Sequence, residues 1–219
     1  MSTITWYGHS AFRLSDDNVS ILIDPYFSVP SLEPEVIEDG VDLVLITHDH
    51  GDHTGDCVDI CKKTHAKLGA IVGTAGALQK KGIPASQILG GTGFNMGGTI
   101  AFKGASVTMT QAYHTSDTGS PAGYIIQMPD GLTVYHAGDT CIFSGMGPVG
   151  QALPYRRGAP AHRRLLHHGL PSGCHGLRSA QMLARHSHAL RHIPRSGKGQ
   201  QPFCGRTEKG NARLYASAA

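Results

Sequence analysis

The sequence predicts an α/β fold built from layers of strands and helices, and three observations support this class. Short β-branched and apolar runs recur through the first 146 residues, helix-type segments lie between two groups of these runs, and glycine or Asp-Gly turns separate neighbouring strands. At 219 residues, 40% of them hydrophobic, the chain is long enough to bury a core as one medium domain. We therefore expect a single domain over residues 1–219.

The expected elements fall into two groups of strands with helices between them. β-Branched runs bounded by turn residues predict strands, and small or apolar positions at helical spacing predict helices. Strands are expected at residues 3–7, 11–14, 19–24, 41–46, 69–72, 99–102, 105–112, 124–128 and 132–136, and helices at residues 54–67 and 76–81.

The most informative motif is T-H-D-H-G-D-H at residues 47–53, directly after an expected buried strand. His48 and His50, two residues apart on an extended segment, can face the same side. A carboxylate and a third imidazole follow at Asp52 and His53. Four side chains of metal-ligand type this close together favour a cation site. The alternative is a solvated polar loop that caps the following helix.

Two further ligand candidates lie at the ends of expected strands. His114 follows the run at residues 105–112, and Asp139 lies in the turn after residues 132–136. Strand ends that converge on one edge of a sheet are where α/β folds usually place their chemistry. We therefore expect both side chains near the histidine motif.

Five motifs in this order resemble the metallo-β-lactamase superfamily, and more narrowly the UPF0173-type bacterial metal-dependent hydrolases related to the ascorbate-6-phosphate lactonases. The motifs are G-H-S at residues 8–10, I-D-P-Y at 23–26, T-H-D-H-G-D-H at 47–53, His114, and G-D-T at 138–140. The resemblance covers residues 1 to about 146. It implies a four-layer αββα sandwich.

The resemblance also implies two adjacent divalent metal ions. The ligands would be His48, His50 and His114 at the first position, and Asp52 and His53 at the second, with Asp139 bridging both. In the family a histidine near the C-terminus normally completes the second position, within a segment similar to M-H-Y-G-T-F-P, and this chain has no such segment.

Four other residues near these motifs have expected roles. Asp24 would orient the ligands from behind. His9 either lines the pocket or caps a turn, and His136, on an expected strand, is favoured as a packed or supporting histidine rather than a ligand. His65, near a helix C-terminus, is expected to be solvated and to complement the helix dipole.

The ligand set predicts hydrolytic chemistry. Mixed nitrogen and oxygen donors suit zinc, with manganese or iron as alternatives. Two such cations about 3.5–4 Å apart can hold a bridging water and bring its pKa to around 7. The resulting hydroxide would attack an ester, lactone or phosphoester bond of a small metabolite. Asp52 is the expected catalytic residue, because its carboxylate can orient the nucleophile or move its proton.

The charge balance changes abruptly after Met146. Residues 1–146 contain seven Lys and Arg against fifteen Asp and Glu, whereas residues 147–219 contain twelve against one. Six of the twelve prolines and seven of the fourteen histidines also lie in residues 147–219, where no strand or helix period is sustained.

A shift of reading frame explains this change. Residues 188–194 (HALRHIP) can be encoded by CAT GCA CTA CGG CAC ATT CCC, which one base later encodes M-H-Y-G-T-F-P. Residues 155–169 likewise permit codons that encode T-A-V-A-L-L-P-I-G-G-F-F-T-M one base later. We therefore predict a single-base insertion or deletion near codons 146–150, so that residues 1–146 resemble the family and residues 147–219 do not.

Two other functions stay open at this point. One is a nuclease of the same fold, although such nucleases usually carry a large extra domain for their substrate. The other is a non-catalytic chain whose Arg- and His-rich tail binds nucleic acid. The frame shift accounts for the tail without selection for nucleic acid, so a small-molecule substrate is favoured over nucleic acid.

Location and assembly follow from what the sequence lacks. It shows no secretory signal, no apolar run near the roughly 18 residues that span a membrane, and five cysteines without a C-x-x-C pair. We expect a cytoplasmic protein with free thiols and no membrane partner. A homo-oligomer stays open.

Overall fold

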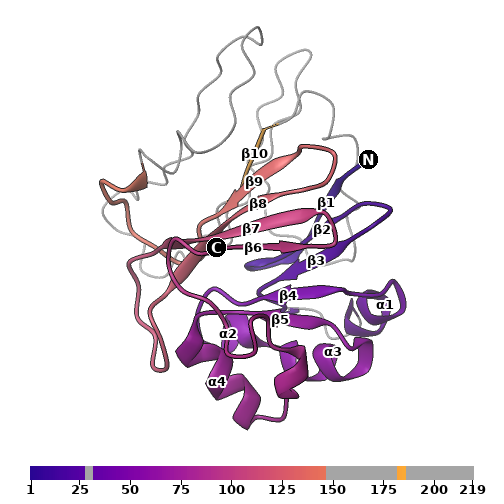
Figure 1. Ribbon diagram of the computed structural model, residues 1–219, viewed down its shortest axis with the longest axis horizontal. Helices are drawn as coiled ribbons and strands as arrows, with labels where there is room; N and C mark the ends of the chain where they lie inside the picture. Colours follow the sequence, from indigo (N-terminus) through magenta and orange to yellow (C-terminus); the bar gives the residue numbers. More distant parts are fainter. Residues whose placement is uncertain (28–31, 147–181, 186–219) are drawn as a thin grey trace, which may run out of the picture.

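The computed structural model describes residues 1–27, 32–146 and 182–185, which form two five-stranded sheets with helices on one side (Figure 1). The first sheet contains β1 (Thr3–Gly8), β2 (Ala11–Ser15), β3 (Ser20–Ile23), β4 (Leu43–Leu45) and β5 (Lys67–Gly69), in that order. β1, β2 and β3 pair antiparallel, whereas β3, β4 and β5 pair parallel. The carboxyl ends of β3 and β4 therefore lie at the same edge of the sheet.

Helices provide the crossovers that parallel strands require. The segment between β3 and β4 contains α1 (Leu32–Glu38), and the segment between β4 and β5 contains α2 (Gly51–Thr54) and α3 (Cys57–Thr64). α4 (Val72–Lys80) and the 3₁₀ helix η1 (Ala85–Gln87) follow β5. None of the helices in the described part of the chain is long and apolar enough to cross a membrane.

The second sheet is antiparallel throughout. It contains β6 (Thr99–Phe102), β7 (Ala105–Gln111), β8 (Ala122–Gln127), β9 (Thr133–His136) and β10 (Met182–Arg185), in the spatial order β10-β9-β8-β7-β6. Strands that are consecutive in the chain are neighbours in this sheet, and short connections join β6 to β7 and β8 to β9.

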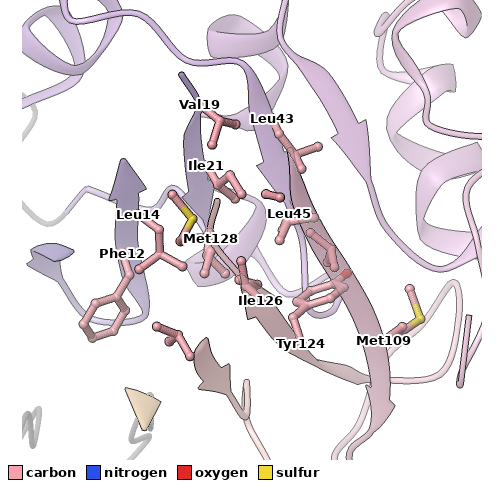
Figure 2. Packing of buried hydrophobic residues seen from close by; sticks show 14 of the residues in the cluster. Phe12, Leu14, Val19, Ile21, Leu43, Leu45, Met109, Tyr124, Ile126 and Met128 are labelled. Carbon is pink, nitrogen blue, oxygen red and sulfur yellow. The ribbon is translucent and has the colours of Figure 1, made fainter. Parts of the chain in front are cut away.

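The two sheets enclose the main hydrophobic core (Figure 2). Side chains of the first sheet, such as Leu14, Ile21 and Leu45, face side chains of the second, such as Tyr124 and Ile126. A second core lies on the other face of the first sheet, where apolar side chains of β3 and β4 pack against α1, α3 and α4. Successive strand residues therefore serve two cores, as alternation along a strand buried on both faces requires.

The predicted helix over residues 54–67 is wrong in its bounds, because the chain makes two helices there. α2 ends at Thr54 and α3 begins at Cys57. Between them Gly55 has φ +36°, and a Cβ at this position would lie 2.4 Å from the Pro25 carbonyl oxygen. The backbone turns at Gly55 because only glycine tolerates both this φ and this close approach.

Other boundaries also differ from the prediction, and α1 was not predicted. The strand expected at residues 69–72 is β5, at residues 67–69, and α4 begins at residue 72 rather than 76. The helices on the first sheet and the two sheets make three of the four predicted layers. The fourth predicted layer, helices on the second sheet, lies outside the described residues. So does the frame shift predicted for residues 147–219, a segment of which only the strand β10 is described.

Candidate metal centre

The candidate site lies where β3 and β4 end. Asp24 follows β3, and Thr47 and His48 follow β4, so the parallel strands bring them to one edge. The Asp24 backbone N–H donates to the Leu45 carbonyl (3.0 Å), and the N–H of Ala122, at the start of β8, donates to the Thr47 carbonyl (2.9 Å). The second hydrogen bond joins the second sheet to the histidine motif.

A buried hydrogen-bond network orients two histidines of the motif. The Asp24 carboxylate accepts from the Thr47 backbone N–H (2.8 Å), from Thr47 Oγ1 (2.7 Å) and from His53 Nδ1 (2.8 Å). Thr47 Oγ1 lies 3.0 Å from His48 Nδ1 and accepts its proton, because the hydroxyl proton already goes to Asp24. With both Nδ1 atoms engaged in this network, Nε2 is the nitrogen that His48 and His53 can present to a cation, which at His53 would take the place of a proton.

Three imidazoles form the first group of donors. His48, His50 and His114 each offer a nitrogen, and these atoms lie within 4.8 Å of one another. His48 Nε2 and His50 Nδ1 are 3.0 Å apart, and the His114 ring lies edge-on to both rings, with centroids at 5.0 and 5.1 Å. Three nitrogens this close can bind one metal ion.

Two further groups share residues with the first. His48, His53 and Asp139 form one group, and His9, Asp52 and His53 form the other, again with donor atoms within 4.8 Å. His9 Nε2 lies 3.4 Å from an Asp52 carboxylate oxygen. The three groups are continuous, because His48 belongs to two of them and His53 to two.

The electrostatics of the site favours positive charge around His53. Burial lowers the pKa of His53, but the carboxylates of Asp24 and Asp139 raise it to about 10. Burial raises the pKa of Asp139, and its interaction with His53 brings the pKa down to about 2. Burial and the charge of His53 lower the pKa of His48 to about 4, so its imidazole stays neutral and can donate a lone pair. A position that stabilises an imidazolium in this way also stabilises a metal cation.

The donor atoms fit a metal ion. His53 Nε2 and Asp139 Oδ1 are buried, have no hydrogen-bond partner in the described part of the chain, and lie 3.5 Å apart. Buried polar atoms of this kind normally have a partner. Imidazole nitrogen and carboxylate oxygen are donors that zinc, manganese and iron all accept.

The structure brings all six predicted ligands to one edge of the two sheets. They are His48, His50, Asp52, His53, His114 and Asp139. Asp139 was expected to bridge both metal positions. One of its carboxylate oxygens lies 3.5 Å from His53 Nε2, a ligand of the second predicted position, and the other lies 3.5 Å from His114 Nε2, a ligand of the first.

The other predicted histidines take distinct places. His9 lies in the site, with its ring 5.2 Å from that of His53 and 5.8 Å from that of Tyr26, between ring centroids. His136 is fully buried, and its Nδ1 accepts from the Gly138 backbone N–H at 3.2 Å. His65 is exposed and ends α3 with a left-handed φ of 58°.

Sequence reasoning missed two residues that organise the site. Thr47 connects Asp24 to His48, and Asp49 binds the segment after His114. Burial raises the pKa of Asp49, but hydrogen bonds from Thr118, Asp117 and Ser116 lower it to about 2. No local signal pointed to the partners of Asp49, because they lie 67 to 69 residues further along the chain.

Comparison with known proteins shows the family to which this chain belongs. A family model described as a β-lactamase superfamily domain matches residues 20–154. The chain belongs to this superfamily, which confirms the superfamily and the fold class predicted from the sequence.

The individual matches are metal-dependent hydrolases by name. A UPF0173 metal-dependent hydrolase of Nitratidesulfovibrio vulgaris is 55% identical over 146 residues, which cover 65% of this chain and 61% of the relative. Another, from Lawsonia intracellularis, is 52% identical and covers 68% of this chain and 66% of the relative. The chain thus matches less than two thirds of the length of either relative.

Solved structures similar to this chain include a metallo hydrolase. Igni18, described as a novel metallo hydrolase from the archaeon Ignicoccus hospitalis, is 38% identical and superposes with a TM-score of 0.60. The match covers 68% of this chain and 66% of that structure. The metallo-β-lactamase fold protein YhfI of Bacillus subtilis, at 18% identity and a TM-score of 0.53, shares the fold.

Proposed function

We propose that this chain is a hydrolase that uses two divalent cations on an ester, lactone or phosphoester bond of a small metabolite. The observation that supports this most strongly is the continuity of the three donor groups, because one edge of the fold presents six predicted ligands and His9 within overlapping sets. Zinc is the proposed metal, with manganese and iron as alternatives.

The predicted ligands would be divided between two cation positions. His48, His50 and His114 would hold one cation, and Asp52 and His53, with His9 beside them, would hold the other. Asp139, which lies 3.5 Å from His53 Nε2 and 3.5 Å from His114 Nε2, would be shared by both. When bound, two such cations act as Lewis acids and lower the pKa of a coordinated water to around 7.

Asp52 is proposed to move the proton of the nucleophile. Its carboxylate is partly exposed, at 23% of the side-chain surface, and lies 3.4 Å from His9 Nε2. A carboxylate that reaches both the donor groups and solvent can accept a proton from water and pass it on. His9 would hold this carboxylate in place.

Metal content tests the proposal. After zinc is added and excess is removed by dialysis, elemental analysis of the full chain is expected to give about two metals per chain. Asp139→Ala should lower the occupancy of both positions because its carboxylate lies 3.5 Å from His53 Nε2 and 3.5 Å from His114 Nε2, whereas His50→Ala should affect one. His65→Ala is the control, because His65 is exposed and belongs to none of the three groups. No bound metal in the unsubstituted chain would contradict the proposal.

Activity then narrows the substrate class. Lactones, phosphodiesters and thioesters are to be compared with and without zinc. Turnover of a lactone or small ester that a chelator abolishes would support the proposal. Turnover of nucleic acid alone would favour the nuclease alternative.

We further propose that residues 147–219 are translated out of frame, that the intact protein is one domain of this family, and that it is cytoplasmic. The matches support the proposed frame shift, because the family model ends at residue 154 and the matches to the two relatives span only 65% and 68% of this chain. Free thiols at Cys57, Cys61 and Cys141 support the proposed cytoplasmic location. Resequencing the gene tests the frame, since a clean read that encodes residues 147–219 as printed, with a stably folded product, would contradict it.

A further inference from the structure

His114 is held differently from the other histidines of its donor group. His48 follows β4 directly and is fully buried, whereas His114 lies on an exposed loop between β7 and β8 and keeps 30% of its side-chain surface exposed. A ligand on such a loop must be fixed by contacts from outside the loop if it is to meet His48 and His50. The segment 113–119, here called the His114 loop, shows where these contacts are.

Asp49 binds the part of the His114 loop that follows the ligand. Its Oδ1 accepts from Ser116 Oγ at 2.8 Å and from the Asp117 backbone N–H at 3.0 Å. Its Oδ2 accepts from the Thr118 backbone N–H at 2.7 Å and from the Thr118 hydroxyl. Four donors from three consecutive residues thus converge on one carboxylate, which has about four acceptor sites.

The position of Asp49 makes this contact specific to the first donor group. Asp49 lies between His48 and His50 in the chain, and its carboxylate binds Ser116, Asp117 and Thr118, which follow His114. The Asp49 carboxylate therefore connects the backbone that carries two ligands to the loop that carries the third, 65 residues away.

The other sides of the loop are also fixed. The Tyr113 backbone N–H donates to Thr140 Oγ1 at 2.9 Å, next to Asp139. At the far end the loop packs on the first turn of α4, where a Cβ added to Gly73 would lie 1.7 Å from the Thr118 carbonyl oxygen. Between these ends, the loop contacts the ligand segment through Asp49 and through Thr115, whose Oγ1 lies 3.4 Å from His50 Nε2.

We propose that Asp49 is a positioning residue that holds the His114 loop against His48 and His50 and so sets the affinity of this donor group for a metal cation. The proposal rests on the metal site of the proposed function and extends it to a residue that donates no ligand atom there.

The test compares isosteric variants by metal affinity rather than by activity. Asp49→Asn keeps the size of the side chain but turns one acceptor into a donor that faces the Thr118 N–H and hydroxyl. In a competition titration of zinc against a chelator, Asp49→Asn is expected to weaken the His48–His50–His114 position by about 10–100-fold, as substitutions behind metal ligands typically do. The second position should keep its affinity, which makes it an internal reference.

A matched control separates geometry from charge. Asp117→Asn also removes one negative charge, here from the His114 loop itself. It leaves the Asp117 backbone N–H, which donates to Asp49, unchanged. Its zinc affinity should stay within about twofold of the unsubstituted chain. Gly73→Ala displaces the same loop from the other side and is expected to weaken the same position.

Amide hydrogen exchange of the metal-free chain gives a second readout. The Asp117 and Thr118 amides should exchange slowly in the unsubstituted chain and faster in Asp49→Asn, while the amides of β7 and β8 stay unchanged. Unchanged zinc affinity in Asp49→Asn would overturn this inference and leave the proposed function standing. An unsubstituted chain that binds no zinc would overturn both.

Discussion

The two sheets contribute to the candidate site in different ways. The first sheet places Asp24 and His48 at the ends of its parallel strands β3 and β4 and His53 in α2, which follows β4, and all three are fully buried. The second sheet contributes His114 and Asp139 from the loops after β7 and β9, with 30% and 5% of their side-chain surfaces exposed. The first set is held by a network within residues 24–53, whereas the second depends on contacts between distant segments.

This difference shows which half of the site is built into the core. Disturbing Asp24 disturbs a buried charge network, so the stability of the whole domain should respond. Disturbing the loops of the second sheet should change the placement of ligands with a smaller effect on stability. The following substitutions test this contrast, from the largest expected effect to the smallest.

Replacing Asp24 should have the largest effect. Asp24→Asn retains an acceptor for the Thr47 backbone N–H but places an amide where the Thr47 hydroxyl and His53 Nδ1 donate. It also removes the nearer of the two carboxylates beside the buried His53, with only Asp139 left, and breaking such a buried pair typically costs about 3–5 kcal/mol. Urea unfolding of the metal-free chain at neutral pH measures the loss.

The control for Asp24 is a carboxylate at the surface. Asp17 is almost fully exposed, and its oxygen lies 3.9 Å from the N-terminal ammonium. Asp17→Asn should change the free energy of unfolding by less than about 1 kcal/mol. Equal effects of the two substitutions would refute the claim that the first sheet holds the rigid half of the site.

Gly138 tests the connection between the two halves. It precedes Asp139, has φ +61°, and a Cβ there would lie 2.8 Å from the Ala122 carbonyl and 2.9 Å from Thr47 Cβ. Gly138→Ala should therefore cost about 1–3 kcal/mol through overpacking, and should lower zinc affinity by moving Asp139.

A second glycine provides the matched comparison. Gly131 also has a positive φ, +87°, but nothing lies within 4 Å of a Cβ built on it. Gly131→Ala should cost only the strain of the left-handed backbone, about 1 kcal/mol, and leave zinc affinity unchanged. Thermal unfolding and zinc titration of both variants separate backbone strain from close packing.

The sequence was sufficient to predict the half of the site that lies close together along the chain. The strand before residues 47–53 and the spacing of His48 and His50 indicated a cation site without any tertiary information. His114 and Asp139 were found because each follows a β-type run, but the residues that hold their loops were not. Asp49 and Thr140 make their contacts with residues distant in sequence, and no local pattern encodes such pairs.

The helix boundaries failed for a related reason. Periodicity predicted one helix over residues 54–67, yet the chain turns at Gly55 because Pro25 approaches its backbone. A glycine within a helix-type run is tolerated often enough that its presence alone does not predict a break. Only the packing of residues 25 and 26 against it decides the outcome.

The smallest effect is expected at Thr140, which holds the start of the His114 loop. Thr140 Oγ1 accepts from the Tyr113 backbone N–H at 2.9 Å and donates to the Cys141 carbonyl at 3.0 Å, in a partly exposed position. Thr140→Val removes both hydrogen bonds and should cost about 0.5–1.5 kcal/mol, because water can replace the lost partners. Thr140→Ser restores the hydroxyl and should recover most of this loss. If urea unfolding instead shows that Thr140→Val destabilises the chain as much as Asp24→Asn, the loops of the second sheet are as integral to the core as the strand ends of the first, and the contrast between the two halves fails.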